Sequence, residues 1–189
     1  MDLGKFTYAF ENFLQKDPQF SEVFNIIKSN SEGNIWIIGG YVYKGITSEF
    51  YGSEISTKDY DFIVESKKGE PNLPGWEISN SRYGNVKIHN SKTSIDLVPL
   101  KNVFSIIKRN IDPTIDNYLT GTPLTVQSIA YDCSNKKIIG EVGCQSIEDK
   151  TVGINYYESA HKEASLKGIT INDFIKSKSD ILGFTPILI

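Results

Sequence analysis

The sequence is poor in the residues that build disulfide frameworks and zinc sites. Its 189 residues include two cysteines, Cys133 and Cys144, and two histidines. So few thiols and imidazoles make neither a disulfide-stapled scaffold nor a structural zinc site. A reducing compartment suits such a chain, so we expect cytoplasmic localisation and no disulfide partner.

Long hydrophobic runs and an excess of positive charge are also missing. No apolar stretch approaches the roughly 20 residues of a membrane-spanning helix, so we expect no membrane partner. The opening MDLGKFTYAF has neither the basic start nor the apolar run of a secretory signal peptide. A net charge of −3 and a pI near 5.5 argue against a uniformly basic surface that coats nucleic acid, and leave a local basic groove open.

What the chain does contain predicts a folded protein. Hydrophobic residues make up 39% and charged residues 23% of the sequence, which is typical of a globular domain. Strand-like and helix-like segments are interleaved, which predicts an α+β fold with one mixed β-sheet of about five to seven strands flanked by helices. We expect helices at residues 6–14, 20–27, 41–45, 103–108, 158–166 and 171–176. We expect strands at residues 35–38, 60–64, 76–78, 86–89 and 94–98, a hairpin from 124–131 and 137–139, and polar loops at 29–33, 47–58 and 67–75.

The most informative segment is Ile35 to Glu65. An apolar strand ends in Gly39-Gly40, and some twenty residues later Asp59 and Asp61 flank Tyr60 in a second apolar strand. Residues i and i+2 of a strand point to the same face, so the two carboxylates project side by side. Asp96 stands in a third apolar strand, and if the last two strands pair, three carboxylates converge on one surface of the sheet.

Neighbouring carboxylates repel each other and are costly to bury, and a divalent cation removes both costs. Mg²⁺ prefers such hard oxygen ligands, and Mn²⁺ can replace it. The simpler interpretation of an isolated Asp-x-Asp pair is a solvated strand face, or for Asp59 a turn cap, and Asp96 alone could simply pair with a lysine. The combination of Gly-Gly, Asp-x-Asp and a third strand aspartate favours the metal site.

At these residues the chain resembles a known family. IIGGYVYKG followed by STKDYDFIVE is similar to the head domain of poly(A) polymerases and CCA-adding enzymes, in the DNA polymerase β nucleotidyltransferase superfamily. The similarity extends, with gaps, through SRYGNVKIHNSKTSIDLVPL to LTVQSIAYDCSNKKIIGEVGCQSIEDKTVG. The resemblance implies a nucleotidyltransferase fold, with residues 1–155 as a head-like domain with N-terminal helices and residues 156–189 as a C-terminal helical appendage.

The resemblance also assigns roles to residues. Asp59, Asp61 and Asp96 would be the catalytic metal ligands, and the backbone of Gly39 and Gly40 would face the nucleoside triphosphate. From their charge, Lys44, Lys58 and Arg82 are the candidates to bind the phosphates. Lys87 and His89 could also place positive charge beside the acids, and an ordinary surface position is the simpler interpretation for these two as for Lys58 and Arg82.

The chain departs from the family pattern at two places. Tyr43-Lys44 stands where the family often has Arg-Asp, and Gly121-Thr122-Pro123 stands where CCA-adding enzymes have Arg-Arg-Asp. Gln127 replaces an asparagine of the following motif. The chain also has no room for the neck and body domains that select the base and hold tRNA, so we do not expect CCA addition to tRNA.

Three functional hypotheses follow. The leading one is a Mg²⁺-dependent nucleotidyltransferase that moves a nucleoside monophosphate from an NTP to a hydroxyl acceptor by a two-metal mechanism. The acceptor stays open between an RNA end, a protein hydroxyl and a small molecule. The second is a catalytically altered or inactive nucleotide-binding module on the same fold. The third is a small toxin-like or antibiotic-modifying transferase.

Overall fold

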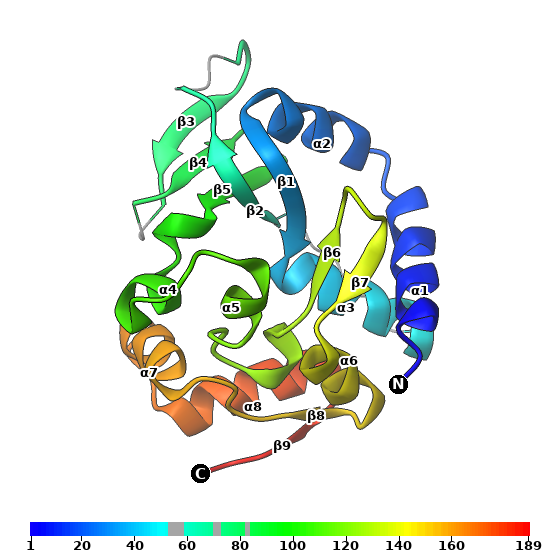
Figure 1. Ribbon diagram of the computed structural model, residues 1–189. Helices are drawn as coiled ribbons and strands as arrows, with labels where there is room; N and C mark the ends of the chain where they lie inside the picture. The colour runs from blue at the N-terminus through cyan, green and yellow to red at the C-terminus, as the bar shows by residue number, and fades with distance from the viewer. Residues whose placement is uncertain (53–58, 70–72, 82–83) are drawn as a thin grey trace.

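The computed structural model describes residues 1–52, 59–69, 73–81 and 84–189 of the chain (Figure 1). Within these residues a central β-sheet is covered on both faces by helices, which confirms the predicted α+β class with a mixed sheet. The sheet has seven strands in the order β3-β4-β5-β2-β1-β6-β7, in which β2 and β5 run parallel and the other neighbours antiparallel. The strands are β1 (Ser31–Ile38), β2 (Asp59–Lys67), β3 (Glu77–Asn80), β4 (Val86–His89), β5 (Ser94–Pro99), β6 (Ala130–Asp132) and β7 (Lys137–Ile139).

The helices surround this sheet at both faces and at its lower end (Figure 1). The α-helices are α1 (Leu3–Gln15), α2 (Phe20–Ser29), α3 (Gly39–Tyr51), α4 (Phe104–Arg109), α5 (Ile115–Leu119), α6 (Glu141–Glu148), α7 (Tyr157–Leu166) and α8 (Ile171–Leu182). Two 3₁₀ turns, η1 (Leu100–Asn102) and η2 (Thr125–Gln127), and a small parallel pair of strands, β8 (Thr151–Val152) and β9 (Thr185–Pro186), complete the described elements.

The alternation of side chains along β1 and β2 creates two cores. Ile37 and Phe62 face the larger hydrophobic cluster, which α1, α2, α3 and α8 complete. Trp36 and Ile63 face the smaller cluster, which η1, α4 and α5 complete. A buried sheet with helices on both faces has nearly continuous apolar strands, and the aspartates of β2 interrupt that pattern on the side of the smaller cluster.

Helix α3 follows β1 without a connecting loop and crosses the sheet close to α1. A Cβ at Gly45 would lie 2.5 Å from Cδ1 of Phe13, so glycine is what lets the two helices approach this closely. This contact fixes α3, and with it the Gly39-Gly40 turn, against the N-terminal helices. The N-terminal segment is therefore part of the scaffold of the site.

Three local predictions were wrong. The polar loop predicted at residues 29–33 is occupied by the end of α2 and the start of β1, and α3 continues to residue 51 through the first part of the loop predicted at 47–58. Residues 124–131 form the η2 turn and only the beginning of β6, although the β6–β7 hairpin is present. Polarity of the sequence caused the first two errors, because both segments have one solvated face. Residues 53–58 lie outside the described residues.

The C-terminal helices pack on the rest of the chain. Phe174 and Leu182 of α8 belong to the larger hydrophobic cluster, and Thr185 of β9 pairs with Thr151 of β8. The division of the chain at residue 155 remains a prediction. None of the helices in the described part of the chain has both the length and the apolar character needed to cross a membrane.

Candidate active site

Asp61 and Asp96 lie directly opposite each other on neighbouring strands. Strands β2 and β5 are parallel, and their register pairs Asp61 with Asp96. Neighbouring strands lie about 4.8 Å apart, so side chains at paired positions on one face are adjacent. Tyr60 and Leu97 point to the other face, into the larger core. The strand pairing on which the sequence argument depended is therefore present, and both acids project from the same side of the sheet.

Asp59 is more exposed than Asp61 and Asp96. It is the exposed first residue of β2 and pairs with Ser94. It lines the same cavity as Asp61 and Asp96. Within the described residues, no three His, Cys, Asp or Glu side chains already converge closely enough to hold a metal ion. The structure thus brings the three acids to one cavity but does not close them into a ligand set.

The electrostatics at Asp61 are those of a site short of positive charge. Burial, together with the negative charges of Asp96 and Asp59, raises the pKa of the Asp61 carboxyl to about 7. Lys87 and Lys178 oppose this rise without cancelling it. Carboxylate oxygens with uncompensated charge are suitable ligands for a hard divalent cation. The carboxylate oxygens on this side of the cavity are therefore suitable donors for Mg²⁺ or Mn²⁺.

The Gly-Gly turn forms the wall next to these acids. Gly39 has φ +69°, and a Cβ added to it would come within 3.2 Å of Cγ of Asp61 and closer still to its Oδ2. Ile38 is the N-cap residue of α3, and its side chain accepts no hydrogen bond from the first amides of the helix. Uncapped amides at a helix N-terminus form an anion site when a ligand reaches them.

The predicted phosphate-binding residues have different outcomes. Lys44 lies on α3 one turn after Gly40, and its Cε is 3.7 Å from the position of a Cβ added at Gly40, so the side chain runs back toward the N-terminus of the helix. Lys58 and Arg82 lie outside the described residues. Lys87, for which we preferred a surface position, pairs with Asp96 across β4 and β5, with Nζ 4.0 Å from Oδ2.

Asp17 forms a hydrogen-bonded hub on the other face of the sheet, which joins the Gly39-Gly40 turn to strand β2. The hydroxyl of Tyr41 donates to Oδ2 of Asp17 at 2.5 Å, and the hydroxyl of Tyr60 donates to the same oxygen at 2.6 Å. The two rings lie 4.7 Å apart between centroids. Tyr41 follows the Gly-Gly turn and Tyr60 separates Asp59 from Asp61. One carboxylate between α1 and α2 thereby fixes the turn and the acidic strand relative to each other.

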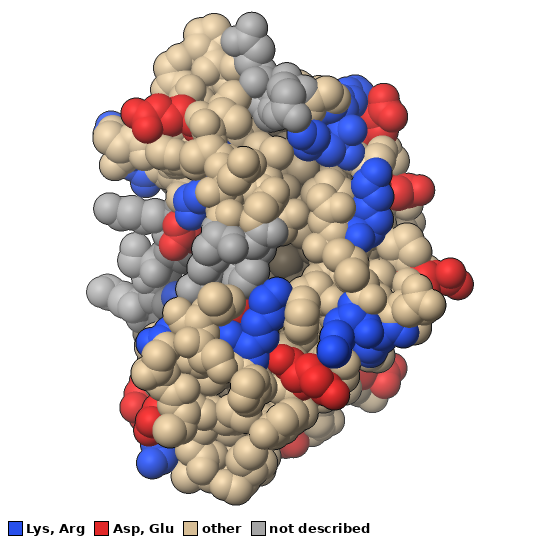
Figure 2. Space-filling view, turned by 90° about the vertical axis from the view of Figure 1, so that its left-hand side faces the viewer, with Lys and Arg blue, Asp and Glu red and all other residues tan. Residues whose placement is uncertain are grey.

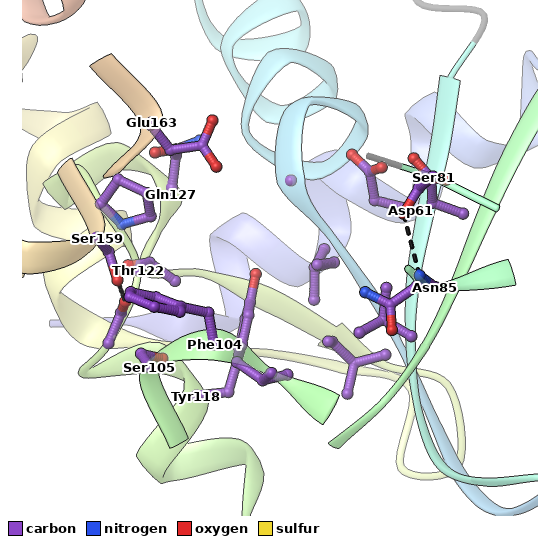
Figure 3. Close-up of a pocket in the computed structure, with 18 of the residues that line it drawn as sticks. Asp61, Ser81, Asn85, Phe104, Ser105, Tyr118, Thr122, Gln127, Ser159 and Glu163 are labelled. Carbon is purple, nitrogen blue, oxygen red and sulfur yellow. Dashed lines mark hydrogen bonds between the residues drawn. The ribbon is translucent and has the colours of Figure 1, made fainter. Parts of the chain in front are cut away.

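The cavity next to the acids has a volume of about 880 Å³. Figure 3 shows Asp61, Ser81 and Asn85 on its sheet side, facing Phe104, Tyr118 and Ser159 across the opening. Helices α4, α5, α7 and α8 form the opposite wall. On the surface, Lys and Arg side chains gather beside a hollow in this face of the molecule (Figure 2). A volume of this size is in the range of small-molecule binding sites.

Several of these residues had no signal in the sequence. Tyr118 is half-buried and lines the cavity, and both burial and the charge of Asp61 raise the pKa of its hydroxyl. Lys162 lies over the ring of Phe104, with Nζ 3.6 Å from the ring centroid. Ser159 anchors α7 by donating a hydrogen bond of 2.8 Å to the carbonyl of Gly121. Lys162 and Ser159 come from α7, which the sequence pattern predicts but cannot orient relative to β2, whereas the short helix α5 that carries Tyr118 was not predicted.

The two cysteines lie away from this chemistry. Both thiols are free, and burial raises the pKa of each, Cys133 and Cys144, to about 12. A thiol is a poor nucleophile when so little of it ionises at neutral pH. Neither cysteine lines the cavity next to the acids.

This architecture is similar to that of several solved structures. A CCA-adding enzyme in complex with ATP matches 94% of this chain with a TM-score of 0.58 and 15% identity, and a CCA-adding enzyme with CTP matches 82% with a TM-score of 0.54 and 15% identity. The Thermotoga maritima CCA-adding enzyme in complex with tRNA matches 78% with a TM-score of 0.52 and 15% identity. The chain has the nucleotidyltransferase fold.

The predicted resemblance is therefore confirmed at the level of the fold. The matched part covers 41%, 37% and 36% of those three chains, so this chain spans well under half of their length. No protein-family profile matches the chain, and no curated protein matches it in sequence. The activity of the chain has to be argued from its own residues.

Proposed function

We propose that this chain is a nucleotidyltransferase that moves a nucleoside monophosphate from an NTP to a hydroxyl acceptor. The observation that carries the proposal is the pairing of Asp61 with Asp96 on parallel strands, beside the uncapped N-terminus of α3. One wall of the cavity thus has the chemistry to hold a cation, and the adjacent wall has the chemistry to hold phosphate. The solved structures with this fold include enzymes bound to ATP and CTP.

The residues that would hold Mg²⁺, or Mn²⁺ in its place, are Asp61 and Asp96, with Asp59 added when the ligand binds. Bound there, two such ions would neutralise the triphosphate and lower the pKa of the attacking hydroxyl. Asp59 is exposed, lies two residues from Asp61 on the same face of β2 and lines the same cavity as the other two acids.

The chain's own residues supply positioning and proton transfer. The amides of Gly39 and Gly40 bind the β- and γ-phosphates, and Lys44 lies beside them. Asp96 accepts the proton of the acceptor hydroxyl as its oxygen attacks the α-phosphorus. The bond between the α-phosphorus and the bridging oxygen breaks, and pyrophosphate leaves with that electron pair. The products are the nucleotidylated acceptor and pyrophosphate.

The test is incubation of the protein with each labelled NTP, Mg²⁺ or Mn²⁺, and acceptors of three classes: RNA ends, proteins and small hydroxyl compounds. We expect the wild type to label one class, and the Asp59→Ala/Asp61→Ala double variant to label none. Asp180→Asn is the matched control, because Asp180 is exposed on α8 and does not line the cavity. Equal incorporation of label by the wild type and the double variant would refute the assignment of Asp59 and Asp61 as catalytic residues.

A second function is favoured by one specific observation. The acids within the described residues are not gathered into a ready ligand set, and the resemblance implies arginines at positions where this chain has Tyr43 and Gly121-Thr122-Pro123. Such a site suits a module that binds nucleotide without turning it over. Calorimetric titration with NTP and Mn²⁺ separates the two proposals: binding without label transfer to any acceptor favours the module, whereas transfer excludes it.

A further inference from the structure

Lys178 is an unusual lysine, because it lies in the cavity with most of its surface covered. It lines the cavity one helical turn after Phe174, which lines it as well, so α8 turns both side chains to the same face. Burial lowers the pKa of Lys178, and the positive charges of Lys167 and Lys44 lower it further. A lysine without a ligand function normally extends into solvent rather than accept this cost.

Two other lysines converge on the same place from different elements. Lys167 ends α7, and its Nζ lies 5.0 Å from the centroid of the Phe174 ring, which holds the ammonium over α8 beside Lys178. Lys44 comes from α3 and runs back along Gly40 toward the helix N-terminus. Lys167 and Lys178 line the cavity, and Lys44 lies close enough that its charge lowers the pKa of Lys178. Cations from α3, α7 and α8 therefore lie near one another beside the N-terminus of α3, which has no side-chain cap.

These lysines bring positive charge opposite the acidic wall, which is the part of the cavity lined by Asp59, Asp61 and Asp96. Glu163 and Asp61 are the acids that partly oppose the effect of the neighbouring lysines on Lys178. Glu163 lines the cavity from α7 and Asp61 from β2. Three lysines that repel one another in the folded chain gain energy from a ligand with several adjacent negative charges. A single carboxylate or phosphate monoester would satisfy only part of this set.

We infer that Lys44, Lys167 and Lys178 form a clamp for a polyphosphate chain, with Lys178 closing it from the C-terminal region. The inference rests on the proposed function, since the polyphosphate would be the triphosphate of the NTP and then the departing pyrophosphate. It also gives residues 156–189 a role in the site, where the sequence predicted only an appendage. The clamp supplies positive charge from α7 and α8 at a site where the arginine motifs of the resembling family are absent.

The inference is tested with inorganic tripolyphosphate, titrated into the full-length protein by calorimetry in metal-free buffer. Without metal, the carboxylates of Asp59, Asp61 and Asp96 contribute nothing favourable, so binding reports on the lysines and on the amides of Gly39 and Gly40, and the Lys178 variants isolate the clamp. The Lys178→Met variant loses a charge-assisted contact, so it should bind tripolyphosphate about ten-fold more weakly than the wild type. The Lys178→Arg variant keeps the charge, so its affinity should stay within about three-fold of the wild type. Lys176→Met is the control, because Lys176 is exposed on the same helix and does not line the cavity.

A structural role for Lys178 predicts a different pattern, and thermal unfolding measures it. If Lys178 serves to bind a ligand, Lys178→Met relieves a buried charge and unfolds at the same or a higher temperature than the wild type. A lower unfolding temperature together with unchanged tripolyphosphate affinity would overturn the inference, as would failure of the wild type to bind tripolyphosphate at millimolar concentration. Tripolyphosphate binding that depends on Lys178 supports the clamp even if no NTP is turned over, so the two proposals fail separately.

Discussion

The backbone of Gly39 packs against the carboxylate of Asp61 so closely that no side chain fits between them. A Cβ at Gly39 would approach Cγ of Asp61 to 3.2 Å and its Oδ2 more closely. The turn that starts α3 and the acidic strand β2 are thus in direct contact. A ligand bound at the first amides of α3 would therefore lie next to this carboxylate.

Gly39→Ala tests this contact, and Gly52→Ala is its matched control. Both glycines have φ +69°, but a Cβ at Gly52 meets nothing within 4 Å. Left-handed strain costs each variant about 1–2 kcal/mol of unfolding free energy. Gly39→Ala should lose a further 1–3 kcal/mol or so, because the methyl group overpacks against Asp61. Urea denaturation measures the difference, and equal losses in the two variants would contradict the close contact.

The Asp17 hub should matter for both stability and activity. Asp17→Ala leaves the hydroxyls of Tyr41 and Tyr60 without their acceptor, and we expect a loss of about 2–3 kcal/mol of unfolding free energy. Tyr60→Phe removes one of the two bonds and should cost about 1 kcal/mol. Tyr8→Phe is the control, since Tyr8 is 69% exposed, and its effect should stay within about 0.5 kcal/mol.

The hub acts on the site only through the position of β2 and α3. Nucleotidyl transfer by Tyr60→Phe, measured well below its unfolding temperature, should therefore show a lower kcat at a nearly unchanged KM for the acceptor. A variant that is destabilised but keeps its full kcat would make Asp17 a residue of stability alone.

The raised pKa of Asp61 predicts how stability depends on pH. The folded chain holds a proton on Asp61 up to about pH 7, whereas the unfolded chain releases it near pH 4. The unfolded state therefore binds fewer protons between pH 4 and pH 7, and the stability from this group, full below pH 4, is lost as pH rises through 7. In metal-free buffer Asp61→Asn should be more stable than the wild type at pH 8, by roughly 1–2 kcal/mol after solvent screening.

The measurement is urea denaturation of both proteins at pH 5 and pH 8. The difference between wild type and Asp61→Asn isolates this carboxyl from other groups that titrate. A difference that is the same at both pH values would mean that Asp61 titrates normally. Addition of Mn²⁺ at pH 8 should restore stability to the wild type and not to the variant, because the metal needs the ionised carboxylate.

Much of the fold and part of the site could be predicted from local patterns. The apolar strands around Asp61 and Asp96 and the glycines that end β1 are properties of short segments, and period-two alternation places both acids on one face. The parallel pairing of β2 with β5 was only a condition of the argument, because register depends on tertiary contacts. Residues 47–51 continue α3 because one face of this segment, with Thr47 and Phe50, packs on the core.

Lys178 illustrates what local patterns cannot supply. In the sequence it is one lysine of an amphipathic helix, indistinguishable from Lys176 two positions earlier. Its place in the cavity comes from the packing of α8 on the core through Phe174 and Leu182. The orientation of that helix relative to β2 is a long-range property of the fold. The same holds for Tyr118, whose short helix α5 becomes part of the site only by packing beside the sheet.

In the proposed complex, one cavity holds a metal–triphosphate between the acids of β2 and β5 and the lysines of α3, α7 and α8. The most direct measurement is a crystal structure with Mn²⁺ and a non-hydrolysable NTP, with the metal located by its anomalous scattering. We expect an anomalous peak between Asp61 and Asp96, and β- and γ-phosphates at the N-terminus of α3 within reach of Lys178. Manganese bound away from both aspartates, or a nucleotide seated elsewhere on the protein, would contradict it.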